Sequence, residues 1–177
     1  MTITNNFYAQ PMIFLYLESL AMFVIWTAAM LLLRGKVRKI VAFTCTVISI
    51  ALILFVTLYG RSRKILDTVP DFLPLISFVK SDLKSVVWRS MFLNILLFIP
   101  LGLSMPFVLS ERVKHNVLVT VLSCAALSVL IELVQLAFSM GKFEVNDMIM
   151  NTLGAALGTV SFLLVSLILK KVNKRRE

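Results

Sequence analysis

Five long apolar runs, separated by short clusters of charged and polar residues, account for most of the sequence. Each run holds about 20 residues, the length that an α-helix needs to cross a hydrocarbon core about 30 Å thick. Lipid offers no partners to backbone amides, so a spanning segment must satisfy its hydrogen bonds internally, as a helix does. The pattern therefore predicts five transmembrane helices, at residues 12–33, 40–59, 91–109, 117–138 and 148–169.

The composition argues against a water-soluble fold. Hydrophobic residues make up 59% of the chain and charged residues 15%, with a mean hydropathy of +0.95. Soluble domains carry about 25% charged residues, and too few are present here to cover a water-facing surface. The first ten residues contain no Lys or Arg, unlike the n-region of a cleaved signal peptide. We expect one all-α, multi-pass membrane domain over residues 1–177, with the first span retained.

The distribution of basic residues predicts the orientation in the membrane. The loops after the first and third spans, together with the tail at 170–177, hold eleven Lys and Arg residues in short segments. The other side holds seven, most of them spread along the loop after the second span. Short cytoplasmic loops carry an excess of Lys and Arg. We therefore expect the N-terminus outside and the C-terminus, with its basic tail, in the cytoplasm.

The net charge of +9 does not indicate a nucleic-acid partner. The basic residues flank the apolar runs, where they contact anionic lipid headgroups. Cys45 and Cys124 lie in the middle of spans, and a lone His115 lies in a short loop, so no zinc-ligand pattern is present. We expect the thiols to pack as small apolar groups. The chain also lacks a phosphate-binding glycine loop and a GxSxG nucleophile motif, so an enzyme is not favoured.

Polar residues inside the apolar runs gather at the predicted outer ends of three spans. Asn94 lies near the start of the third span, and Glu132 and Gln135 lie near the end of the fourth, on one helical face. Asp147 and Asn151 lie one turn apart at the start of the fifth. Because these ends all face outside in the predicted topology, we expect a polar pocket near the outer mouth of a helix bundle.

Glu132 is the most informative of these residues. A bare carboxylate inside a membrane is costly, so it must be paired, protonated or exposed to water. A salt bridge to Arg61, Arg63 or Lys142 in the outer loops is the structural alternative to a functional role. Glu18 also lies inside a span, but the other polar positions are far from it in the predicted topology.

Two further features concern packing at the outer end. Gly154 and Gly158 form a GxxxG pattern, which lets another helix approach closely, and they continue the polar stripe of the fifth span. In the loop at 61–90, Pro70 and Pro74 interrupt any regular helix. The apolar residues around these prolines indicate a segment that lies in the membrane interface or re-enters the membrane.

Three strings, NILLFIPLG, SVLIELVQ and FEVNDMIMNTLGAALG, occur in this order in the second half of the chain. Their sequence and spacing resemble the VanZ-like family of bacterial membrane proteins, over residues 55–165. The resemblance implies a bacterial cell-membrane location and an association with resistance to glycopeptide antibiotics, teicoplanin-type lipoglycopeptides in particular. Together with the polar positions above, it gives these ligand-binding candidates: Arg61, Asn94, Glu132, Gln135, Lys142, Asp147 and Asn151.

The last of these strings departs from the family pattern, which is close to Arg-x-Phe-Asp-x-Asp-Asp. Lys142 replaces the Arg, Glu144 and Asn146 replace two Asp, and Asp147 is kept. Lys lacks the bidentate fork of Arg, and Asn removes a charge, so a metal cage of three acids is not expected. Glu132 and Asp147 with water would suffice for a single divalent cation, but we predict no metal and no cofactor.

Three functions remain open on the sequence alone. The first, which we prefer, is binding of a lipid-bearing ligand at the outer leaflet: a membrane lipid, a lipid-linked cell-wall intermediate or a lipoglycopeptide. The second is an intramembrane enzyme with Glu132 or Asp147 as its catalytic acid or base. The third is a polar-lipid transporter coupled to titration of Glu132, against which the lack of an internal repeat counts. The ligand and the oligomeric state stay undetermined.

Overall fold

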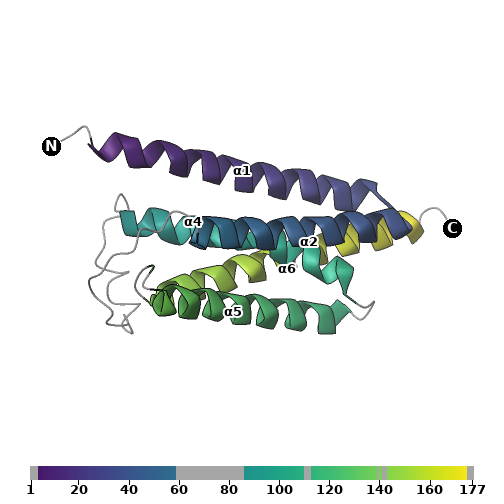
Figure 1. The fold of residues 1–177 in the computed structure, drawn as a ribbon. Helices are drawn as coiled ribbons and strands as arrows, with labels where there is room; N and C mark the ends of the chain where they lie inside the picture. Colours follow the sequence, from purple (N-terminus) through teal and green to yellow (C-terminus); the bar gives the residue numbers. More distant parts are fainter. Residues whose placement is uncertain (1–3, 59–85, 110–112, 139, 141–142, 175–177) are drawn as a thin grey trace.

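The computed structural model describes residues 4–58, 86–109, 113–138, 140 and 143–174, and these form an all-α bundle (Figure 1). Each predicted span coincides with one helix of this bundle, so the fold-class prediction is confirmed. The helices extend beyond several of the apolar runs, because a helix satisfies its own backbone in the polar interface as well as in lipid. They are α1 (Thr4–Leu32), α2 (Gly35–Leu58), α4 (Val86–Val108), α5 (Val113–Ala137) and α6 (Val145–Lys174).

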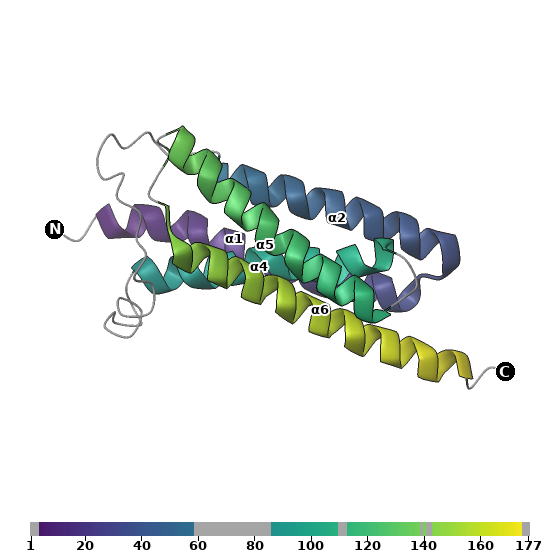
Figure 2. The ribbon, with the colours of Figure 1, turned by 90° about the horizontal axis from the view of Figure 1, so that it is seen from below.

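The helices lie side by side, with α1, α4 and α6 running in one direction and α2 and α5 in the other (Figures 1 and 2). One end of the bundle, called the site end below, holds the last turns of α2 and α5 and the first turns of α4 and α6. The opposite end, called the basic end, holds the turn between α1 and α2 and the last turn of α6. α4 contacts each of the other four helices and forms the centre of the bundle.

Helix length and composition support a membrane-spanning bundle. Within α1, the described apolar segment Leu17–Leu32 is shorter than a full span. The described segments that are long and apolar enough to cross a membrane are Gly35–Leu58, Met91–Val108, His115–Ala137 and Val145–Lys174.

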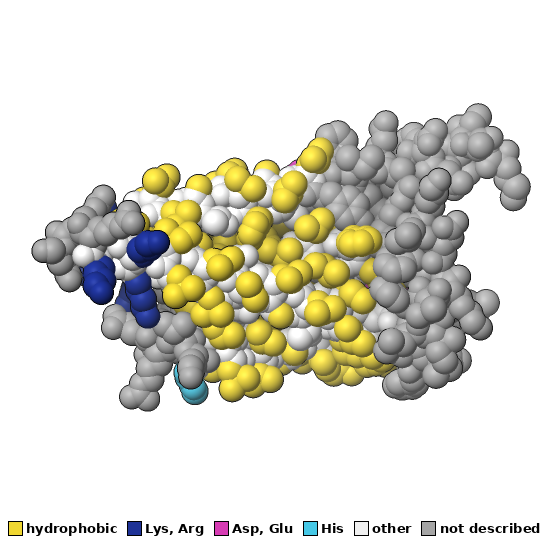
Figure 3. All heavy atoms as spheres, turned by 180° about the vertical axis from the view of Figure 1, so that it is seen from behind, with side chains coloured by type: hydrophobic (Ala, Val, Ile, Leu, Met, Phe, Trp, Pro, Cys, Tyr) yellow, Lys and Arg dark blue, Asp and Glu magenta, His cyan; other side chains and the backbone are white. Residues whose placement is uncertain are grey.

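The outer surface of the bundle is apolar along most of its length. Ile25 and Leu122 are 61% and 60% exposed, and Figure 3 shows apolar side chains over the middle of one face, with Lys and Arg at one end. Soluble proteins rarely expose so large a continuous apolar surface. The prediction of a multi-pass membrane protein is confirmed. The prediction that the basic end faces the cytoplasm stays a prediction.

The closest helix contact joins α4 to α6, which run parallel. A Cβ atom at Gly154 would overlap the carbonyl group of Ile95, and one at Gly158 would overlap the α4 backbone one turn further along. On the α4 side, Gly102 lies against the backbone of Ala155. Helices in lipid associate through such close backbone packing, since apolar surface alone gives no preference for another helix over lipid tails. The predicted role of the GxxxG pattern is confirmed.

Among the described side chains, two apolar clusters fill the interior. Both cysteines are free and belong to these clusters, as predicted for small apolar side chains. The cluster nearer the site end, called the site-end cluster, consists of Ile53, Leu97, Phe98, Leu101, Cys124, Ile131 and Ala155. The cluster nearer the basic end consists of Trp26, Met30, Ala42, Cys45, Leu103, Phe162 and Val165.

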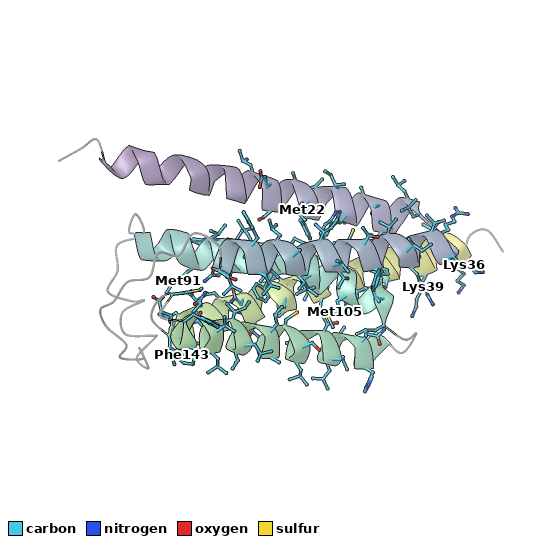
Figure 4. The ribbon with its side chains drawn as sticks, in the orientation of Figure 1. Met22, Lys36, Lys39, Met91, Met105 and Phe143 are labelled. Atoms are coloured by element: carbon cyan, nitrogen blue, oxygen red, sulfur yellow. The ribbon has the colours of Figure 1, made fainter. Side chains whose placement is uncertain are left out.

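The turn between α1 and α2 closes the basic end. Gly35 has φ +51°, a left-handed conformation that glycine adopts without a steric cost. The Arg38 Nε donates a hydrogen bond of 2.8 Å to the carbonyl oxygen of Leu33, which caps the end of α1. Lys36 and Lys39 project from this turn at the basic end (Figure 4).

Candidate functional site

A layer of buried polar side chains lies at the site end of the bundle, between α4, α5 and α6. Met91, one turn ahead of Asn94 on α4, and Phe143, just before α6, mark this end in Figure 4. Every member of the layer is at most 8% exposed. The members, called the polar layer below, are Asn94, Ser128, Glu132, Gln135, Asp147 and Asn151.

Helical periodicity places these residues directly beyond the site-end cluster. On α4, Asn94 precedes the cluster residue Phe98 by four positions. On α6, Asn151 precedes Ala155 by four positions, and on α5 Ser128 follows Cys124 by four. Residues four apart lie on the same helical face, so each helix adds a polar group one turn beyond an apolar one.

Glu132 is 2% exposed and connects α5 to the start of α6. Its Oε2 accepts a hydrogen bond of 2.8 Å from the backbone N–H of Glu144, the residue just before α6. A carboxylate that accepts a backbone N–H makes a strong, charge-assisted bond. The predicted alternative partners, Arg61, Arg63 and Lys142, lie outside the described residues.

Gln135 connects α5 to the end of α2. Its Nε2 donates a hydrogen bond of 3.0 Å to the carbonyl oxygen of Thr57, in the last turn of α2. The backbone carbonyl oxygen of Gln135 accepts a hydrogen bond of 2.8 Å from the backbone N–H of Met140. The bond to Thr57 fixes where α5 ends relative to α2, and the bond from Met140 closes the end of α5.

Asn151 reaches across from α6 to α5. Its Nδ2 donates to the Ser128 Oγ, at 2.8 Å. The Asn151 Oδ1 and the Asn94 Nδ2 are both buried and have no hydrogen-bond partner among the described residues. Some polar groups of the layer therefore form hydrogen bonds that join helices, and others have no hydrogen-bond partner among the described residues.

Asp147 lies in the first turn of α6 and is buried on the same stripe as Asn151, Gly154 and Gly158. The predicted stripe is thus confirmed as a buried face. The backbone N–H of Asp147 donates a hydrogen bond of 3.1 Å to the carbonyl oxygen of Glu144. A negative charge in a first helical turn is stabilised by the positive end of the helix dipole.

The structure brings together five of the seven predicted ligand-binding residues in this layer. Arg61 and Lys142 lie outside the described residues, as does most of the loop at 61–90. Glu18 is exposed on α1 and does not join the layer. Among the described residues, no three His, Cys, Asp or Glu side chains gather as a metal site requires.

Ser128 is a member of the layer that sequence reasoning missed. It precedes Glu132 by four residues and therefore shares its helical face. That spacing was a usable signal, but a serine in an apolar helix is usually bonded to its own helix backbone. Its bond to Asn151 depends on the contact between α5 and α6.

A shallow apolar depression lies on the outer face of α6 beside the polar layer. Its volume is about 350 Å³, and it is open to the surface. Met148, the first of the residues that line it, directly follows Asp147 in the chain. The lining residues are Met148, Ile149, Thr152, Leu153 and Ala156.

Comparison with known families gives a match to the segment that contains this site. The family model VanZ/LLP1 matches residues 43–167, which include the whole polar layer and the contact between α4 and α6. Neither a curated protein nor a solved structure matches the chain. The resemblance seen in the sequence motifs is thereby confirmed. The chain belongs to the VanZ/LLP1 family.

Proposed function

We propose that this protein binds a lipid-bearing ligand whose polar headgroup enters the polar layer at the site end, in a bacterial cell membrane. Through this binding it contributes to resistance against teicoplanin-type glycopeptides. The observation that carries the proposal is the polar layer itself, six buried polar side chains, two of them carboxylates, gathered at one end of the bundle.

Burial of polar groups in a membrane protein costs free energy unless hydrogen bonds compensate it. Helix packing accounts for part of the layer, since Glu132 and Gln135 join α5 to neighbouring segments. It does not account for the Asn94 amide or for the Asn151 side-chain carbonyl. A ligand headgroup that bonds to these groups supplies the missing compensation.

The surroundings of the layer suit a ligand with an acyl chain. The depression on α6, from Met148 to Ala156, is apolar and faces away from the buried stripe of the helix. A headgroup in the layer and a chain along this depression would lie on different faces of the same turns of α6. In the predicted orientation the site end is outside, where lipid-linked cell-wall intermediates and lipoglycopeptides are found.

Native mass spectrometry of the gently solubilised protein tests the binding. We expect the wild type to carry a lipid or lipid-linked molecule of defined mass, and Asp147→Asn to carry less of it. Glu18→Gln is the matched control, because it removes an exposed carboxylate outside the layer. Absence of any defined ligand, or equal loading of all three proteins, would contradict the proposal.

Antibiotic susceptibility tests the link to resistance. Expression in a susceptible host should raise the inhibitory concentration of a glycopeptide that carries an acyl chain more than that of one without it. Asp147→Asn should remove the effect and Glu18→Gln should keep it. Equal effects on both antibiotics would argue against recognition of the lipid part.

Two buried carboxylates in one layer also favour an alternative, an intramembrane enzyme that uses Glu132 or Asp147 as acid or base. An enzyme would change the covalent structure of a lipid. Mass spectra of lipid extracts, compared between cells with the wild type and cells with Glu132→Gln, decide between binding and catalysis.

A further inference from the structure

Two buried amide atoms of the polar layer lack hydrogen-bond partners among the described residues: the Nδ2 of Asn94 and the Oδ1 of Asn151. The two residues are 8% and 3% exposed, so water outside the bundle does not reach them freely. An unpaired buried polar group costs about 1–3 kcal/mol. An unsatisfied buried group in a native fold therefore calls for an explanation, such as a water, an ion or a ligand.

The two asparagines lie within one helical turn of each other in depth along the bundle. Gly154 of α6 lies against the carbonyl group of Ile95 on α4. Asn94 directly precedes Ile95, and Asn151 is one turn ahead of Gly154. Both asparagines also stand one turn beyond the site-end cluster, to which α4 and α6 each contribute residues. They therefore lie on the segments of α4 and α6 that pack against each other at the site end.

The buried polar groups outside the polar layer include both paired and unpaired side chains. The Asn116 Nδ2 on α5 donates to the Pro106 carbonyl oxygen at 3.2 Å, and the Thr46 and Ser104 hydroxyls bond to each other at 3.0 Å. The hydroxyls of Ser49 and Thr120 are also buried without a partner among the described residues. They lie one turn deeper than the site-end cluster and outside the polar layer.

The open groups are one donor and one acceptor, and this pair selects a class of ligand. A phosphodiester only accepts hydrogen bonds, so it would leave the Asn151 carbonyl unpaired. An ammonium group only donates, so it would leave the Asn94 amide unpaired. A hydroxyl both donates and accepts, so one hydroxyl can accept from the Asn94 Nδ2 and donate to the Asn151 Oδ1.

We propose that the polar layer recognises a neutral hydroxyl group of the ligand headgroup, from a glycerol or a sugar, which accepts from Asn94 and donates to Asn151. The inference rests on the proposed function and names the part of the headgroup that enters the layer. Ser128 orients Asn151 through its bond to the Nδ2 and leaves the Oδ1 available.

Thermal unfolding of the purified protein tests the inference, in lauryldimethylamine oxide, a detergent without hydroxyl groups. The probes are 1-decanoylglycerol and methyl decanoate, which share the acyl chain and the ester and differ in the glycerol hydroxyls. We expect decanoylglycerol, at about 100 times its Kd, to raise the Tm of the wild type by roughly 5 °C or more. Methyl decanoate should give a clearly smaller shift.

Two variants locate the effect. Asn94→Leu, which is similar in size, should abolish the difference between the probes, and it should not lower the Tm without a probe because it removes an unpaired buried amide. Asn116→Leu is the matched control, with a buried amide at the other end of α5. It should keep the difference between the probes even though its own Tm falls.

Three outcomes would overturn the inference. Equal shifts by the two probes would mean that the hydroxyl is not recognised, and a lipid seen by native mass spectrometry would then leave the proposed function standing. No shift with either probe would mean that only water occupies the layer. A hydroxyl-dependent shift that survives in Asn94→Leu would place recognition elsewhere. The wild-type comparison needs no variant, so poor accumulation of Asn94→Leu does not prevent the test.

Discussion

At the scale of single residues, the side chains of the polar layer differ in the groups to which they bond. Glu132 accepts a backbone N–H from the segment before α6, so its carboxylate organises the entry of that helix. Asn151 uses one end of its amide to hold Ser128. The same buried residue therefore serves packing with one atom and is available to a ligand with another.

We predict that Glu132→Gln abolishes function while most of the protein still folds. A glutamine oxygen still accepts from the Glu144 N–H, but without the charge the bond is weaker by about 1 kcal/mol, or roughly 2–4 °C in Tm. Resistance assays and thermal melts of the variant check this, with Glu18→Gln as the tolerated control. Full resistance in Glu132→Gln would reduce the residue to a structural one, and failure to accumulate would favour a buried salt bridge.

Asp147→Asn should change the Tm by no more than roughly 2 °C yet lose function. The substitution is nearly isosteric, and an asparagine is also accepted in a first helical turn. The expected loss is in the stabilisation that a bound ligand gives the native state. Melts with and without lipid extract measure it. An Asp147→Asn variant that unfolds as readily as a packing mutant would show that Asp147 is structural.

At the scale of helices, the parallel pair of α4 and α6 sets the position of the layer. Gly154, Gly158 and Gly102 bring the two backbones into direct contact. This contact fixes how far α6 is shifted along α4, and so it fixes the depth of Asn94 relative to Asn151. The layer is thus a consequence of the glycine contact one turn deeper.

Gly154→Leu should lower the Tm strongly. The added side chain overlaps the Ile95 carbonyl, which is backbone and cannot turn away. Overpacking costs about 1–3 kcal/mol, which corresponds to roughly 2–12 °C for a chain of this length. Ala126→Leu, on the exposed face of α5, also introduces a leucine side chain and should melt like the wild type. Equal melting of both variants would contradict the close contact.

At the scale of the whole molecule, the two ends of the bundle differ in character. The basic end carries Lys36 and Lys39 beside the turn and Lys170, Lys171 and Lys174 at the end of α6. The site end holds the polar layer. If the basic end contacts the cytoplasmic leaflet, the layer opens toward the outer leaflet, where the proposed ligand is found.

Labelling in intact cells tests this orientation. In a variant with Cys45 and Cys124 replaced by Ala, Met140→Cys lies at the site end and Val172→Cys at the basic end. An impermeant thiol reagent should modify the first and leave the second unmodified until the membrane is permeabilised. The reverse pattern would place the layer at the inner leaflet and remove extracellular ligands from consideration.

Much of the bundle follows from the sequence by itself. The five apolar runs determined the helices, because each segment in lipid must satisfy its own backbone. Chain direction then placed Asn94, Glu132 and Asp147 at one end, and the GxxxG spacing indicated a close helix contact. These are local or counting properties, so one sequence suffices for them.

The tertiary structure alone decided which helices meet and what each polar group bonds. Lipid tails are as apolar as the helix surfaces, so the hydrophobic pattern does not say which faces pair. Three features depend on this pairing. The glycines of α6 pack against α4, Glu132 bonds to a backbone N–H, and Ser128 bonds to Asn151 in the polar layer. The unpaired amides of Asn94 and Asn151 became visible only once every neighbouring donor and acceptor was in place.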